Sequence, residues 1–169
     1  GSVAAHEAAA AVLTAWIPGP SWPAAIAAAL VGQINPGGKL PLSWPRSAGH
    51  IPVYYRQKRS GGRSHWKGDY ADAPVAPLYA FGHGLSYTTF ELVASAPQPS
   101  VVGITDEVVV SVDVHNRGHR DGDEVVQLYI RDPRARITRP VLELKAFARV
   151  TVAAGATRRV RFAVPVAQL

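Results

Sequence analysis

The sequence predicts a mainly β protein, an antiparallel β-sandwich preceded by a partial α/β segment. Three observations support this fold class. Apolar residues alternate with polar ones along the C-terminal half, a short helical pattern lies between turn signals near the N-terminus, and a polar, glycine-rich stretch separates the two. The chain is therefore expected to divide into residues 3–55, a connecting loop over residues 56–76, and a sandwich over residues 77–169.

The N-terminal segment has the pattern of a strand, a helix and a second strand. Val12–Trp16 is expected to form a short buried strand, and Lys39–Ser43 an edge strand interrupted by Pro41. Between them, Ser21 is a suitable N-cap for a helix over residues 24–31, because its hydroxyl can accept a hydrogen bond from the first turn. One such unit cannot cover both faces of a parallel sheet, so the segment is expected to be a piece of a larger α/β domain.

The expected helix has a narrow apolar face. Ile26 and Leu30 are four residues apart and lie on the same side, so this side is expected to pack on a neighbour. Pro23 is tolerated in the first turn, and Gly32 is expected to end the helix.

Residues 77–169 show the alternation of half-buried strands. Val108, Val110, Val112 and Val114 are expected to face the core, because the residues between them point to the opposite side. Roughly seven short antiparallel strands without cysteines are typical of a fibronectin type III-like, that is immunoglobulin-like, sandwich. The clearest expected strands cover residues 108–114, 126–130, 142–145, 149–152 and 160–164.

The connecting loop is the best candidate for a binding role. It has no helical or strand period, and long loops without structure of their own are often functional. Its rings can stack on sugars and its cations and histidine can donate to hydroxyl groups, while Gly61 and Gly62 allow close approach to a ligand. The alternative is a solvated connector in which Trp66 packs against the sandwich. The candidate substrate-binding residues are Arg63, His65, Trp66, Lys67 and Tyr70.

No catalytic or metal site is expected within the chain. Most acidic residues fall in expected turns or on solvent-facing strand positions, and no pair of them stands out as the carboxylates of a hydrolase. Asp121, Asp123 and Glu124 are close together but lack the ligand spacing of a calcium loop. The histidines have no metal-ligand spacing, and no cofactor motif is present.

Composition narrows the class of partner. The 169 residues include no cysteine, and their formal net charge is +6. A basic balance is compatible with nucleic-acid binding, but no recognition helix or RNA-binding motif accompanies it, so we expect no nucleic-acid partner. No apolar run approaches the ~20 residues that span a bilayer, so we expect no membrane partner.

Two motifs resemble a known family. Phe81-Gly-His-Gly-Leu-Ser-Tyr-Thr-Thr-Phe90 and Asp123-Glu-Val-Val-Gln-Leu-Tyr-Ile-Arg-Asp-Pro133 resemble the C-terminal part of family 3 glycoside hydrolases, which include β-glucosidases and β-xylosidases. Ala15-Trp16-Ile17-Pro18-Gly19 and Gly37-Gly38-Lys39-Leu40-Pro41 are similar to the last βαβ portion of that family's α/β-sandwich domain. The resemblance extends from about Ala8 to Leu169, and it implies that Phe81, Gly82, Gly84 and Leu85 are domain-junction residues.

The resemblance implies a part of a retaining, exo-acting β-glycosidase, most like bacterial β-glucosidases. In such enzymes the nucleophilic aspartate lies in an N-terminal barrel, and in many members the acid/base lies in an earlier part of the α/β domain, so neither is matched here. The chain alone is expected to be inactive. Its implied partners are the barrel, the remaining α/β part, a β-linked oligosaccharide or glycoside, and a second copy of the parent enzyme. A periplasmic or secreted location is favoured.

A second reading stays open at this point. A stand-alone fibronectin type III-like carbohydrate-binding or adhesion module would also have these strands, although it would not need the incomplete α/β unit. In the resembling enzymes, the segment that joins the two domains can run towards the sugar-binding cleft of the same subunit or of a neighbour.

Overall fold

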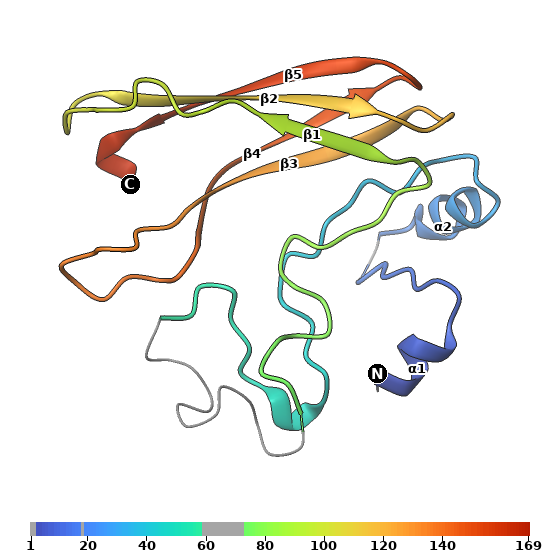
Figure 1. Ribbon diagram of the computed structural model, residues 1–169. Helices are drawn as coiled ribbons and strands as arrows, with labels where there is room; N and C mark the ends of the chain where they lie inside the picture. Colours follow the sequence, from blue (N-terminus) through green and yellow to red (C-terminus); the bar gives the residue numbers. More distant parts are fainter. Residues whose placement is uncertain (1–2, 18, 59–72) are drawn as a thin grey trace.

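The computed structural model describes residues 3–17, 19–58 and 73–169 (Figure 1). Five strands form two antiparallel sheets, β1-β2-β5 and β3-β4, that lie face to face. This confirms the mainly β fold class. The helices are α1 (Val3–Ala8) and α2 (Trp22–Leu30), and the strands are β1 (Phe90–Ala94), β2 (Glu107–Asn116), β3 (Gly122–Ile130), β4 (Glu143–Val152) and β5 (Thr157–Pro165). Short 3₁₀ turns cover Ala48–His50 and Val166–Gln168.

The core lies between the two sheets. Val112 and Val114 of β2 are buried, and Val112 stands opposite Val160 of β5 in the antiparallel register. Val126 of β3 and Val152 of β4 enter the same cluster from the other sheet. The even-numbered residues of β2 therefore face inward, as the alternation predicted, because strand side chains alternate between the two faces.

The strand count differs from the expectation. Among the described residues the sandwich has five strands rather than about seven, and the two short strands expected over residues 142–152 are a single strand, β4. Strand β1 was not anticipated. The β1–β2 connection contains Pro97 and Pro99, which cannot donate to a ladder, and only an isolated bridge between Gln98 and Val109 extends the pairing there.

The N-terminal segment contains the expected helix but not the expected strands. α2 follows Ser21, although the Ser21 side chain makes no cap hydrogen bond, and Gly32 follows the helix with a φ of 74°. Residues 11–16 are irregular, and Val12 is 50% exposed. The prediction of a buried strand at Val12–Trp16 is wrong for this chain, because none of the described residues pairs with it.

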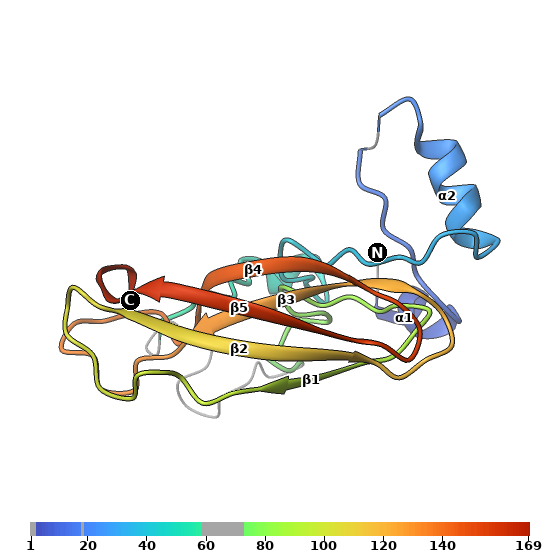
Figure 2. The same ribbon diagram turned by 90° about the horizontal axis from the view of Figure 1, so that it is seen from above.

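Two further expectations about this segment are wrong. Residues 39–43 form no strand; Pro41 interrupts them, and Leu40 instead exchanges backbone hydrogen bonds with Gly82 and His83. The apolar stripe of α2 is not packed, since Leu30 is 70% exposed and Ala29 is the buried residue of the helix. Figure 2 shows the reason: α2 stands away from the sandwich at one end of the molecule.

A partly buried ion pair joins the N-terminal segment to the sandwich. The Lys39 ammonium lies 2.9 Å from one carboxylate oxygen of Glu124 on β3, and it also donates to the backbone oxygen of Gly84 at 3.0 Å. Gly82 has a φ of 79°, and its carbonyl accepts a hydrogen bond from the Gln127 amide. Gly82 and Gly84 therefore lie at the junction, as expected, whereas Leu85 is 78% exposed and does not pack there. Neither described helix is long and apolar enough to cross a bilayer.

Candidate functional site

The five residues predicted to contact sugar lie outside the described residues. Arg63, His65, Trp66, Lys67 and Tyr70 all fall in the segment 59–72, so their placement stays a prediction. The structure does describe the chain on both sides of that segment. These two ends determine where the segment leaves and re-enters the body of the protein.

The incoming end is attached to the sandwich by rings and backbone. Tyr55 stacks on Phe81 with ring centroids 4.1 Å apart, and the Tyr129 ring of β3 meets Tyr55 edge-on at 6.5 Å. The Gln57 carbonyl accepts a hydrogen bond of 2.9 Å from the Val141 N–H. Burial and the neighbouring Tyr55 raise the pKa of Tyr129 above its ordinary value, so its hydroxyl stays protonated and donates to Gln127.

The outgoing end is held by a buried histidine. One ring nitrogen of His50, Nδ1, lies 3.1 Å from the backbone N–H of Arg46 and accepts from it. The other, Nε2, lies 2.9 Å from the Val75 carbonyl, so we assign the proton to Nε2. His50 is only 3% exposed, and Arg46 adds a second bond of 2.9 Å to the Ala76 carbonyl. Arg46 and His50 thus hold the backbone of residues 75–76, just after the segment 59–72.

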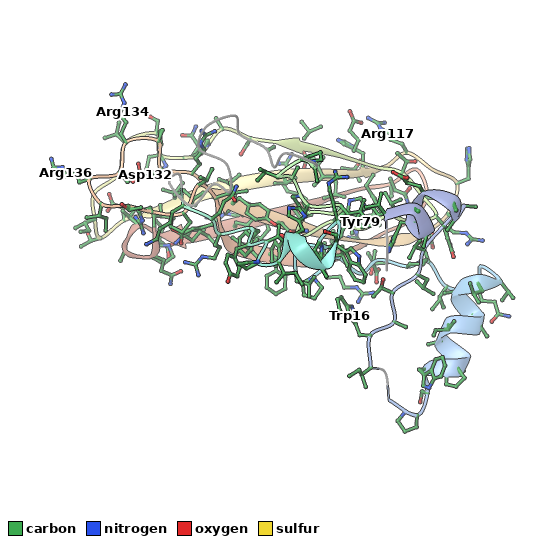
Figure 3. All side chains as sticks on the ribbon, turned by 90° about the horizontal axis from the view of Figure 1, so that it is seen from below. Trp16, Tyr79, Arg117, Asp132, Arg134 and Arg136 are labelled. Carbon is green, nitrogen blue, oxygen red and sulfur yellow. The ribbon has the colours of Figure 1, made fainter. Side chains whose placement is uncertain are left out.

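A row of rings lies beside these contacts. Trp44 contacts His6 of α1 and Trp16 at centroid distances of 5.8 and 6.0 Å, and Tyr79 stacks on His83 at 5.0 Å. Trp16 and Tyr79 are labelled in Figure 3. Two backbone hydrogen bonds, from the Trp44 N–H to the Tyr79 carbonyl and from the Leu78 N–H to the Trp44 carbonyl, hold the two parts of the row together. The row packs the N-terminal segment onto the junction motif, and it accounts for the packing role expected of His83.

Several carboxylates of the described residues are engaged with cations, hydroxyls or backbone N–H groups. Asp113 pairs with Arg159, and Asp123 accepts from Thr151 and Arg149. These partners hold the pKa of both carboxyls below their ordinary value, the opposite of the raised pKa that a catalytic acid needs. Asp121 accepts from the Ala154 N–H. Among the residues that the structure describes, no group of three or more histidines and acids could hold a metal ion.

The N-terminal segment leaves an open apolar face. A hollow of about 280 Å³ lies between α2 and the irregular chain before and after it, and its lining includes Leu13, Trp22, Ile26 and Ile34. Leu13, Trp22 and Ile34 are 46 to 48% exposed. Large apolar side chains exposed together in this way mark a surface that packs against something else.

Sequence reasoning missed His50 and Tyr55 as anchors of the loop. A usable signal was present for Tyr55, since the doublet Tyr54-Tyr55 stands immediately before the basic stretch. His50 offered none, because the partners that anchor it here, Arg46 and Val75, are main-chain groups 4 and 25 residues away.

Both parts of the chain match known protein families. Residues 2–87 match the model of the glycosyl hydrolase family 3 C-terminal domain, and residues 124–169 match that of the fibronectin type III-like domain. The chain is 40% identical over 168 residues to the periplasmic β-glucosidase of Salmonella typhimurium, covering 94% of this chain and 22% of that protein. It is 40% identical to a β-xylosidase of Formosa agariphila, covering 89% of this chain and 21% of that protein.

Solved structures agree with the sequence matches. The β-glucosidase of Listeria innocua, solved in complex with isofagomine, superposes with a TM-score of 0.83 at 38% identity, covering 90% of this chain and 22% of that one. This chain thus spans about a fifth of the length of these relatives. It belongs to glycoside hydrolase family 3 and carries that family's C-terminal domain together with its fibronectin type III-like domain.

Proposed function

We propose that the complete enzyme is a retaining, exo-acting β-glycosidase of the β-glucosidase type, and that this chain is its structural C-terminal part. The observation that carries the proposal is the 40% identity to a β-glucosidase over 94% of this chain. Retaining glycosidases use two carboxyl groups about 5–5.5 Å apart, one as nucleophile and one as acid and base. The strand carboxylates Asp113 and Asp123 are engaged with arginines that keep their pKa low, which does not suit a catalytic acid, and we propose that both catalytic groups belong to the rest of the enzyme.

The partner of the open apolar face is the rest of the same enzyme. The remaining α/β part of the enzyme would supply strands that pair with residues 12–16. That part and the barrel would pack against the exposed side of α2. A stand-alone binding module has no use for an uncovered face of this kind, which disfavours that alternative. We further propose that the enzyme acts in the periplasm or outside the cell and that it forms a homodimer, which sedimentation of the complete enzyme would test.

We expect this chain by itself to hydrolyse no aryl-β-glucoside above background, because it lacks both catalytic carboxylates. The complete enzyme should turn over the same substrate and release the sugar first as the β-anomer, which NMR distinguishes from the α-anomer. Turnover by the chain alone that persists through repurification, and that disappears when one of its acids is replaced, would contradict the proposal. Release of the α-anomer by the complete enzyme would contradict its retaining mechanism.

We also propose that the segment 59–72 contributes to the sugar cleft. The two ends of the segment are pinned by Tyr55 and His50, and a fixed base presents a loop in a defined direction. Trp66 and Tyr70 would stack on a sugar ring, while Arg63, His65 and Lys67 would donate to its hydroxyl groups.

Trp66→Ala in the complete enzyme is expected to raise KM roughly fivefold, since a stacked ring is worth about 1 kcal/mol. The Tm should change by less than about 2 °C, because a residue that serves binding contributes little to folding. Tyr54→Ala is the matched control, as Tyr54 is 67% exposed and lies outside the segment; it should leave KM unchanged. A lowered Tm with unaltered KM would establish the connector role instead.

A further inference from the structure

The positive charge of this chain is concentrated at one end of the sandwich. The β3–β4 connection and the residues packed beside it hold seven of the 18 basic residues but only two of the 12 acidic ones, a net charge of +5 out of a total of +6. The rest of the chain, outside this end and the segment 59–72, contains eight basic and eight acidic residues, so its charges balance. The residues of this basic end are Arg56, Lys58, Arg131, Arg134, Arg136, Arg139 and Lys145, with Asp132 and Glu143.

The contacts join part of this basic end into one cluster around Glu143. Glu143 is shared by Lys145 at 3.2 Å, Arg56 at 3.4 Å and Arg139 at 3.8 Å. Lys58 forms an isolated β-bridge with Pro140, which follows Arg139. The three cations around Glu143 hold the pKa of its carboxyl below the ordinary value, so it is ionised at neutral pH, yet one carboxylate cannot balance three cations.

Three arginines of the tip, which is the β3–β4 connection over residues 131–142, have no carboxylate partner among the described residues. Arg131, Arg134 and Arg136 form no ion pair with any residue that the structure describes. Asp132 serves local structure, because its carboxylate accepts from the Arg134 backbone N–H at 3.0 Å. Figure 3 shows the Arg134 and Arg136 side chains extending away from the body of the sandwich.

The arginines border a hollow. A depression of about 220 Å³ is lined by Arg131 and Arg139, by the acidic residues Asp132 and Glu143, and by apolar wall that includes Pro133 and Pro140. A guanidinium presents paired N–H donors that match carboxylate and sulfate groups in two-point geometry, and it is less strongly hydrated than a lysine ammonium. The tip contains arginine at all four of its basic positions, which favours recognition of such groups over a merely soluble surface.

We propose that this basic end is a binding surface for an acidic polysaccharide, one whose sugars carry carboxylate or sulfate groups. Single-stranded nucleic acid is disfavoured because residues 130–142 contain no aromatic ring on which bases could stack. A membrane surface is disfavoured because Ile137 is the one strongly exposed apolar side chain of this tip, too little for insertion. The surface also lies at the end of the molecule away from α1 and α2 (Figures 1 and 2), so it does not compete with the apolar face that packs on the enzyme.

Binding of the complete enzyme to polygalacturonate and to dextran sulfate at about 0.15 M salt tests this surface, with neutral dextran as the reference. The R134Q/R136Q variant is expected to bind both polyanions about tenfold more weakly, the equivalent of one lost charge-assisted hydrogen bond. The matched control is R158Q/R161Q, which removes the same charge from two exposed arginines of β5. Neither arginine forms an ion pair with a described residue. The affinity of this control should change less than about twofold. R134K/R136K should bind with intermediate affinity.

The outcomes separate this surface from catalysis. All three variants should keep the kcat/KM of the complete enzyme on a neutral aryl-β-glucoside, so a wrong assignment of the glycosidase activity would not affect the binding result. A preference for dextran sulfate or for polygalacturonate identifies the anionic group. The proposal would be overturned if the complete enzyme bound neither polymer, or if both arginine pairs weakened binding equally. Tighter binding to an oligonucleotide or to phosphatidylserine vesicles through the same arginines would also overturn it.

Discussion

Val112→Asp is expected to unfold the sandwich. Val112 is 6% exposed, stands opposite Val160 and belongs to the cluster that joins the two sheets. Aspartate at this position would place an unpaired charge among valines and also lose the buried methyl groups. The cost should exceed about 4 kcal/mol, a large part of the stability of a domain of this size. Denaturant unfolding followed by circular dichroism measures it.

Val109→Asp is the matched control for this change. Val109 lies on the same strand three residues away, on the opposite face, and is only partly buried. Its aspartate can reach solvent, so the loss should stay near 1 kcal/mol. Equal damage from both substitutions would show that the inward face of β2 has been assigned wrongly.

Glu124→Ala is expected to have the second largest effect. The side chains of Glu124 and Lys39 are 11% and 16% exposed, and the ammonium retains only the Gly84 carbonyl when the carboxylate is removed. Removing one partner of a buried pair typically costs about 3–5 kcal/mol, because the remaining charge is left without compensation. We expect a loss of about 3 kcal/mol, measured by thermal or denaturant unfolding.

Two comparisons make this expectation specific. Replacing both residues by apolar ones of similar volume, K39M/E124L, should restore most of the stability, since no unpaired charge then remains. Glu91→Ala removes an exposed partner of Arg117 and should cost less than about 1 kcal/mol. Equal losses for Glu124→Ala and Glu91→Ala would mean that the Lys39–Glu124 pair does not join the two parts of the chain.

The inward face of the sandwich strands could be predicted because alternation is visible within a single stretch of sequence. The valines at every second position of β2 can satisfy a core only on one face, so alternation alone identifies the inward residues. β4 was expected as two pieces, since Lys145 to Arg149 lack a clean alternation, yet pairing with β3 carries the strand through them, with a register irregularity at Leu128 and Tyr129. Cross-strand pairing is not visible in a single stretch of sequence.

The N-terminal segment could not be predicted to the same degree, because its expected strand needs neighbouring strands that this chain does not contain among its described residues. Val12–Trp16 has the composition of a buried strand, but a strand needs a partner for its N–H and C=O groups. α2 forms without such a partner because its hydrogen bonds are internal. The loop anchors fall between these cases: His50 acts through main-chain groups of Arg46 and Val75, which carry no sequence signature.

Hydrogen exchange at the N-terminal segment most directly tests whether this chain is one part of a larger enzyme. The amides of residues 22–34 and of β2 and β5 are compared in this chain alone and in the complete enzyme. Residues 22–34 should exchange rapidly in the isolated chain and slowly in the complete enzyme, where the apolar face around Trp22 and Ile34 is covered, while β2 and β5 should be protected in both. Equal protection of residues 22–34 in the two proteins would contradict the account.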